Sequence, residues 1–266
     1  MIMTIFKKNW RDHWKTMFSW TLGIVFMSAL ELSVYPTLLK SGKGIDDFMK
    51  NFPESIQKVL HMQDYTSGPG FISTELFSLV LPMVFIAVGS SWGCSAVAEE
   101  EEKGTADLLF SMPISRQNIL LGKMLSIVSS LCALGIITYL AISLGAPLVN
   151  LTINNIYLAS ATVLVASLGF FFSGAGLLLG TLIGKKGLAL GMTSGLALLL
   201  SVVYSLAPLV NNLDPINKFN PFEWALAGRI LFEGGQISNE VKLVLLSLAL
   251  YLATIWVIKR KDIRTQ

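Results

Sequence analysis

The side chains that could do chemistry gather in one short charged segment, residues 98–118. It opens on four consecutive glutamates, 99–102, and continues with Lys103, Asp107 and Arg116. Long apolar runs flank it on both sides, so the chain leaves a lipid-like environment here. Ion pairing and the docking of a partner protein are the chemistry that such a segment supports.

Catalysis and metal binding have little basis in the sequence. The two histidines, His13 and His61, and the two cysteines, Cys94 and Cys132, show no metal-ligand spacing. No Gly-Lys pair has the preceding glycine and the following Ser or Thr of a phosphate-binding loop. We therefore expect no catalytic residue, no metal site and no cofactor in this chain.

The elements around the charged segment are expected to be membrane-spanning helices. Hydrophobic residues make up 53% of the chain and charged residues 14%, well below the roughly 25% of a soluble domain. The mean hydropathy of +0.63 agrees with this. Six charge-poor runs are long enough to cross a bilayer, and they cover residues 17–39, 71–98, 119–145, 156–183, 188–210 and 241–258. The predicted fold is an all-α integral membrane protein with a single transmembrane domain over residues 1–266.

The distribution of Lys and Arg gives the predicted orientation. Basic residues are denser before the first run, around residues 98–118, at Lys185 and Lys186, and after the last run. By the positive-inside rule these parts face the cytoplasm, so both termini are cytoplasmic and loops 40–70 and 211–240 lie outside. The expected location is the cell membrane. Because the basic residues flank spans without forming one aromatic-laced patch, no nucleic-acid partner is expected.

Residues 1–16 have the pattern of an amphipathic helix. Met3, Phe6 and Trp10 share a face with helical spacing, and Lys7 and Arg11 lie beside it. This predicts an interfacial helix in contact with membrane lipid, and the alternative is a basic flank that only sets topology.

Capping signals divide the charged segment. The glutamates are expected to continue the second span, and Gly104 to end it in the left-handed conformation. Thr105 is a candidate N-cap for a short helix that Pro113 stops, and Ser115 a candidate cap for the third span. That short helix exposes apolar residues, either to a docking partner or to the bundle and lipid.

The segment resembles the cytoplasmic loop of type 2 ATP-binding-cassette (ABC) permeases. The resemblance lies in the acidic run, Gly104-Thr105, the Leu-Leu pair, Pro113 and the Ile-Leu-Leu-Gly-Lys run that follows. It implies a coupling helix that contacts an ATPase subunit, two permease subunits forming a homodimer or heterodimer, and ATP and Mg bound by the partner ATPase. The residues assigned to this coupling are Glu99, Glu100, Glu101, Glu102, Gly104, Thr105, Asp107, Leu108, Leu109, Phe110, Pro113 and Arg116, with Lys185 and Lys186 as a second contact or a lipid anchor.

Glycines recur at four-residue spacing on both sides of the Lys185-Lys186 turn. Such small-residue ridges let helix backbones approach closely, which predicts close packing of the fourth and fifth spans. The glycines concerned are Gly176, Gly180, Gly184, Gly187, Gly191 and Gly195.

Two polar positions and one outer segment complete the candidate residues. Glu31 lies within a span and Glu75 near the end of one, and each either faces the bundle or reaches toward headgroups. Asn220 can cap an apolar outer helix that begins at Pro221 and contains Phe222 and Trp224. The resemblance favours a re-entrant helix here, and an interfacial helix is the alternative.

The expected function is that of an ABC exporter permease for an amphipathic or lipid-like substrate, drug or peptide. The scarcity of charge within the spans argues against an ion-coupled carrier. Two alternatives remain: a permease-like subunit that transmits ATPase work to an outside partner without passing cargo, and a membrane scaffold or carrier that needs no ATPase.

Overall fold

The computed structural model describes residues 2–40, 64–65, 67–104 and 115–260. Within these residues the chain is helical and contains no β-strand. Six helical segments are long and apolar enough to cross a membrane, which confirms the predicted span count. Their bounds agree with the predicted runs to within a few residues except at the N-terminus.

The described helices follow one another in chain order. The first three spans are α1 (Ile2–Lys40), then α4 (Gly68–Ile72), a π-helix (Ser73–Val80) and α5 (Leu81–Glu102) in series, then α7 (Arg116–Gly145) with a 3₁₀ turn (Ala146–Val149). The last three are α8 (Asn155–Ile183), α9 (Lys186–Leu206) with a 3₁₀ turn (Ala207–Leu209), and α13 (Ile237–Arg260). Between α9 and α13 lie a 3₁₀ turn (Asn211–Leu213), α10 (Asp214–Asn217), α11 (Pro221–Leu226) and α12 (Ile230–Glu233).

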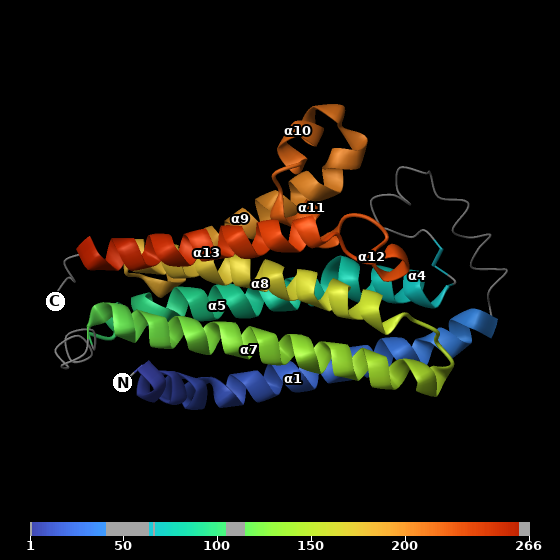
Figure 1. Ribbon diagram of the computed structural model, residues 1–266, viewed down its shortest axis with the longest axis horizontal. Coiled ribbons are helices and arrows are strands. Elements are labelled where there is room, and N and C mark those ends of the chain that lie inside the picture. Colours follow the sequence, from blue (N-terminus) through green and yellow to red (C-terminus); the bar gives the residue numbers. More distant parts are fainter. Residues whose placement is uncertain (1, 41–63, 66, 105–114, 261–266) are drawn as a thin grey trace.

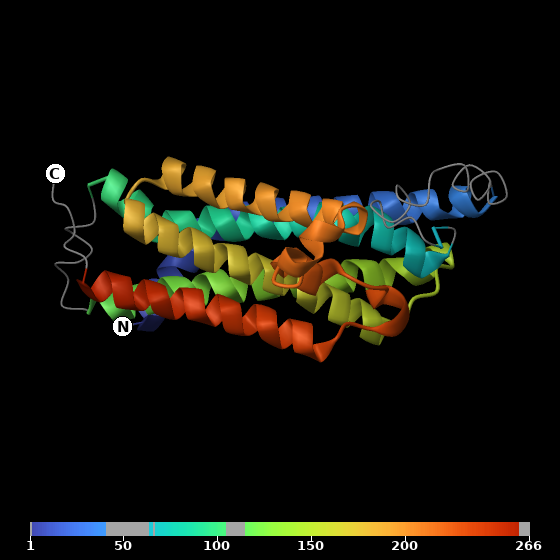
Figure 2. The same cartoon turned by 90° about the horizontal axis from the view of Figure 1, so that it is seen from above.

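Helix α8 is the centre of the bundle. It packs on α5, α7, α9 and α13, and Figure 2 shows it between α9 and α13. In its most apolar stretch 78% of the residues are buried, against 17% in α9. Helix α9 therefore presents most of its surface outside the chain's own core.

Both ends of the chain lie at one end of the bundle. Figure 1 shows the beginning of α1 and the end of α13 on the same side as the end of α5 and the start of α7. The turn between α8 and α9 lies there too, because Lys186 pairs with Glu99 at the end of α5. We call this the charged end, and the opposite one, which holds α4 and α12, the far end.

The predicted separate interfacial helix over residues 1–16 is corrected. Residues 2–16 are the first turns of α1, which runs unbroken to Lys40. These turns pack on α7: Asn9 Nδ2 donates to Ser126 Oγ at 3.0 Å, and Ile5 lies against Gly122. The amphipathic pattern thus reflects a helix with one face on the bundle.

The predicted close packing of spans four and five through glycine is wrong. Gly176 and Gly180 of α8 lie against α5, where an added Cβ would be 2.9 Å from Cys94 Sγ and 2.8 Å from Cys94 O respectively. Gly89 and Gly93 of α5 complete this contact from the other side. Spacing identified a small-residue face but not the helix that meets it.

The remaining predicted glycines have other roles. Gly184 ends α8 in the left-handed conformation, with φ 71°. A Cβ at Gly187, Gly191 or Gly195 would meet no atom of the described chain within 4 Å, so this stripe of α9 is open.

Candidate functional site

The acidic run ends α5 as the sequence predicts. Helix α5 continues through Glu102, and Gly104 follows with φ 65°, a conformation that glycine adopts at little cost. Ser115 caps α7, its Oγ accepting from Asn118 N at 3.3 Å. The predicted coupling helix and its residues Thr105, Asp107, Leu108, Leu109, Phe110 and Pro113 lie outside the described residues.

Glu99 joins the end of α5 to the start of α9. Its two carboxylate oxygens lie 2.6 Å from Lys103 Nζ and 2.9 Å from Lys186 Nζ. Glu102 adds a second link by accepting from the backbone N–H of Lys186 at 3.0 Å. The hydrogen bond to Glu99 and its negative charge raise the pKa of Lys103.

Glu100 joins α5 to α7 through Lys123. The Lys123 Nζ donates to Glu100 Oε1 at 3.0 Å and to Ala96 O at 2.7 Å. The Lys123 side chain is only 9% exposed, so these partners offset the cost of removing its charge from water. Sequence reasoning missed this residue, which looked like a flank of the third span.

The structure thus brings part of the predicted coupling set together. These residues contact other residues of the same chain, which the sequence did not predict. Glu99, Glu100 and Glu102 are engaged within the chain: Lys186 is a partner of Glu99 and Glu102, and Lys123 is a partner of Glu100. Glu101 and Arg116 also have interaction partners. Lys185 precedes α9 as its N-cap residue. These contacts join the helices on both sides of residues 105–114 and the start of α9 into one charged cluster.

A polar cavity of about 340 Å³ lies inside this cluster, between α1, α5 and α7. His13 and Trp92 stack across it with ring centroids 5.6 Å apart. His13 was expected at the lipid interface, and it instead faces the second span. The His13–Trp92 stack adds α1 to the helices that the charged cluster joins.

A larger groove opens between α5, α9 and α11, with Trp20 of α1 at its side. Its volume is about 790 Å³, and none of the described residues that line it carries a charge. Serines supply most of its polar groups, and Ser90 is 1% exposed with no hydrogen-bond partner for its Oγ. The lining serines are Ser78, Ser90, Ser91, Ser194, Ser201 and Ser205. This groove could not be predicted from the sequence, because its serines come from helices far apart in the chain.

Two short helices, α11 and α12, stand where a single outer helix was expected, and α11 packs about midway along α8. Asn220 caps α11 by accepting from Phe222 N at 3.0 Å, and its Nδ2 donates to Leu200 O at 2.8 Å. Pro221 occupies the first turn as predicted. Phe222 is buried against Phe172 and Tyr204, and Trp224 Nε1 donates to Lys218 O at 2.8 Å.

The two candidate intramembrane carboxylates lie near each other at the far end. Glu75 is in the π-helix and accepts from Tyr65 Oη at 2.5 Å, and Glu31 is close enough to interact with it electrostatically. Burial, followed by the hydrogen bond to Glu75, raises the pKa of Tyr65. Glu75 is therefore held by a protein donor rather than presented to a transported ion.

Comparison with known protein families identifies the fold. The family described as ABC-2 family transporter protein matches residues 3–262 of the 266. The chain belongs to this family. A search of curated proteins returned no match.

Membership in the ABC-2 family establishes the general role. The chain is a multi-pass membrane transport component and not a catalytic subunit, and permeases of this family work in general with an ATPase partner. The charged cluster and the groove are therefore features of an ABC-2 permease.

Proposed function

We propose that this chain is the permease subunit of an ATP-driven exporter. It lies in the cell membrane with both termini in the cytoplasm, so the charged end faces the cytoplasm. Residues 98–118 contact a separate ATPase subunit, which binds ATP and Mg. The observation that carries this proposal is the set of ion pairs that ties both sides of residues 105–114 to the rest of the bundle.

Those ion pairs give a route by which ATPase movement reaches the membrane. A displacement of residues 105–114 moves the ends of α5 and α7 that flank them. Lys123 holds these two ends together, and Glu99 and Glu102 carry the movement to α9 through Lys186. Since α5 and α9 form two walls of the groove, this movement changes the groove's width.

A second permease subunit completes the path. Helix α9 is mostly uncovered, its Gly187, Gly191 and Gly195 face no atom of the described chain, and exposed leucines flank them. A second subunit can approach the α9 backbone closely along this stripe and close the groove from outside. The absence of charge in the groove's lining favours an amphipathic or lipid-like cargo.

The test combines co-purification with an activity measurement. Tagged protein, solubilised gently, is expected to bring down an ATPase whose hydrolysis is stimulated by the permease. Changing Asp107, Leu108 and Leu109 together to alanine should abolish both binding and stimulation. The matched control is Glu233→Gln, an exposed change at the far end, which should alter neither.

Three outcomes separate the alternatives. Loss of binding in the triple variant alone supports the coupling role. No ATPase in the purified complex, or full function of the triple variant, contradicts it and favours a scaffold or carrier. A complex that hydrolyses ATP in response to an outside partner, but moves no cargo, indicates force transmission without transport.

A further inference from the structure

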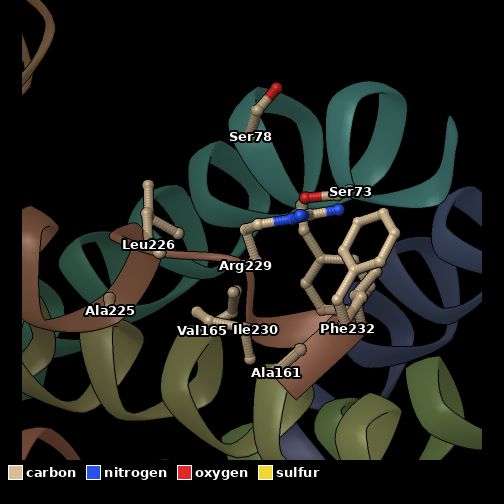
Figure 3. A pocket seen from close by; sticks show the side chains of 12 residues that line it. Ser73, Ser78, Ala161, Val165, Ala225, Leu226, Arg229, Ile230 and Phe232 are labelled. Atoms are coloured by element: carbon tan, nitrogen blue, oxygen red, sulfur yellow. The ribbon is translucent and has the colours of Figure 1, made fainter. Parts of the chain in front are cut away.

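A third, smaller pocket lies toward the far end, beneath the break between α11 and α12. Its volume is about 230 Å³. Figure 3 shows Arg229 extending across this pocket between Ser73 of the π-helix and Phe232 of α12. Apolar side chains, among them Ala161 and Val165 of α8, form its floor. Among the described residues that line it, Arg229 is the one with a charged side chain.

Two contacts hold Arg229 in place, and they engage only part of the hydrogen-bonding capacity of its guanidinium. Its guanidinium lies 4.1 Å from the centroid of the Phe232 ring, and one nitrogen pairs with the Asp64 carboxylate. The two paired side chains are 45% and 53% exposed. A guanidinium has five N–H donors, and an exposed ion pair contributes little to stability, so another anion can take the place of Asp64.

Two other carboxylates, in the π-helix and in α11, already have donors. Glu75 accepts from Tyr65 Oη, and Glu223 accepts from Asn217 Nδ2 at 2.7 Å. Asp64 is thus the carboxylate that pairs with the Arg229 guanidinium, and this ion pair shows that the pocket can bind an acidic group. Carboxylates and phosphates match the planar donor geometry of arginine.

The pocket adjoins the serine-lined groove. Ser78 and Leu226 line both of them. One end of a ligand can therefore lie at Arg229 while its body crosses these two residues into the uncharged groove. The combined site has one positive charge at the far end and an apolar, hydroxyl-bearing wall along the rest.

We propose that this combined site binds an amphiphile with a single acidic head group. The carboxylate or phosphate pairs with Arg229 in place of Asp64, and the apolar body lies in the groove. The inference rests on the proposed function in that it names the class of cargo. Uncharged amphiphiles fill the groove without the ion pair, and cationic ones are disfavoured at Arg229.

The test compares two fluorescent probes that differ only in the head group. The protein is placed in nanodiscs of phosphatidylcholine without nucleotide, and the binding of a pyrene-labelled C16 carboxylate and of the matching alcohol is titrated. We expect the carboxylate to bind about tenfold more tightly than the alcohol, the ratio that corresponds to one charge-assisted hydrogen bond. Arg229→Gln should bring carboxylate binding down to the level of the alcohol and leave the alcohol unchanged.

Two further variants keep the test independent of folding defects. Asp64→Asn removes the internal competitor, and Asn tolerates the φ of 55° found at this position, so it should bind the carboxylate more tightly than the native protein. Arg260→Gln is the matched control, because Arg260 stacks on Trp256 at the same 4.1 Å but at the charged end. It should bind both probes as the native protein does.

The outcomes decide the proposal. Equal binding of the two probes, or equal effects of Arg229→Gln and Arg260→Gln, overturns it. Displacement of the carboxylate probe by phosphatidic acid in the nanodisc identifies a membrane lipid as the occupant, and lack of displacement identifies a free amphiphile; both support the site. The measurement uses no ATPase, so its failure leaves the ATP-coupled role to be judged by co-purification.

Discussion

The contact between α5 and α8 depends on glycine, and Gly93→Ala tests it most sharply. A Cβ at Gly93 would lie 2.2 Å from the backbone oxygen of Ser173, whereas ordinary contact begins at 3.4 Å. Backbone atoms cannot rotate away, so the two helices must separate by about 1 Å along this face. Ser173 also shares a 2.5 Å hydrogen bond with Tyr251 of α13, which the shift would disturb.

The expected loss of stability in Gly93→Ala follows from two opposing effects. Overpacking a close contact costs about 1–3 kcal/mol, and at this distance the upper part of the range applies. Alanine gains about 1 kcal/mol over glycine in a helix interior. The net destabilisation is therefore about 1–2 kcal/mol, which lowers the Tm of a chain this size by about 2–8 °C. Gly23→Ala in α1 is the matched control, because its Cβ would meet nothing within 4 Å.

A thiol-reactive dye can follow unfolding in detergent. Cys94 is buried at this interface and Cys132 is exposed, so a Cys132→Ser background leaves Cys94 as the reporter. We expect dye labelling of Gly93→Ala to begin at a lower temperature than that of the parent, and Gly23→Ala to match or exceed the parent. Equal midpoints for the two glycine variants would refute the close packing of α5 on α8.

The remaining predictions concern two charged groups. Lys123→Met should lower stability by about 2 kcal/mol, because it removes the charged donor that Lys123 gives to Glu100 Oε1 and Ala96 O, and adding Glu100→Gln should restore part of the loss in a double-mutant cycle. In α11, burial raises the pKa of Glu223 above its usual 4.5. The hydrogen bond from Asn217 lowers this pKa and offsets the rise only in part. A raised folded-state pKa means that Glu223 contributes stability at pH below 4.5 and loses it as the pH rises through the folded value, so the native Tm should rise on acidification relative to Glu223→Gln. Unchanged pH dependence in Glu223→Gln, with exposed Glu233→Gln as control, would contradict the burial of this carboxylate.

Features set by short stretches of sequence were predictable. Lipid imposes a minimum length on apolar helices, so six runs of sufficient length gave six spans. Gly104, Ser115 and Asn220 act on neighbouring backbone groups, so their capping roles follow from residue type and position. Residue type and position do not predict that a helix continues past an expected boundary. Residues 2–16 were expected to form a separate helix, but nothing in them ends α1 before the first span.

Features that depend on which helices meet were not predictable. The spacing of Gly176 and Gly180 predicts a face of small residues on α8, but it does not predict which helix packs against that face. The structure shows that this helix is α5 and not α9. In the sequence, Lys123 looks like a basic residue that flanks the third span. Its role depends on the packing of α5 antiparallel to α7, which places Glu100 beside it. Arg229 and Asp64 are 165 residues apart, and only the packing of α12 near α4 brings them together.

The most direct test of the ATP-coupled role is transport by the complex of this permease with the ATPase that co-purifies with it. The complex is reconstituted in liposomes with the ATPase facing the outside medium, and the uptake of the pyrene-labelled carboxylate is followed after ATP is added. We expect uptake that requires ATP and Mg and is lost when Asp107, Leu108 and Leu109 are changed together to alanine. Uptake at the same rate without ATP, or in the triple variant, would contradict a permease driven through residues 98–118.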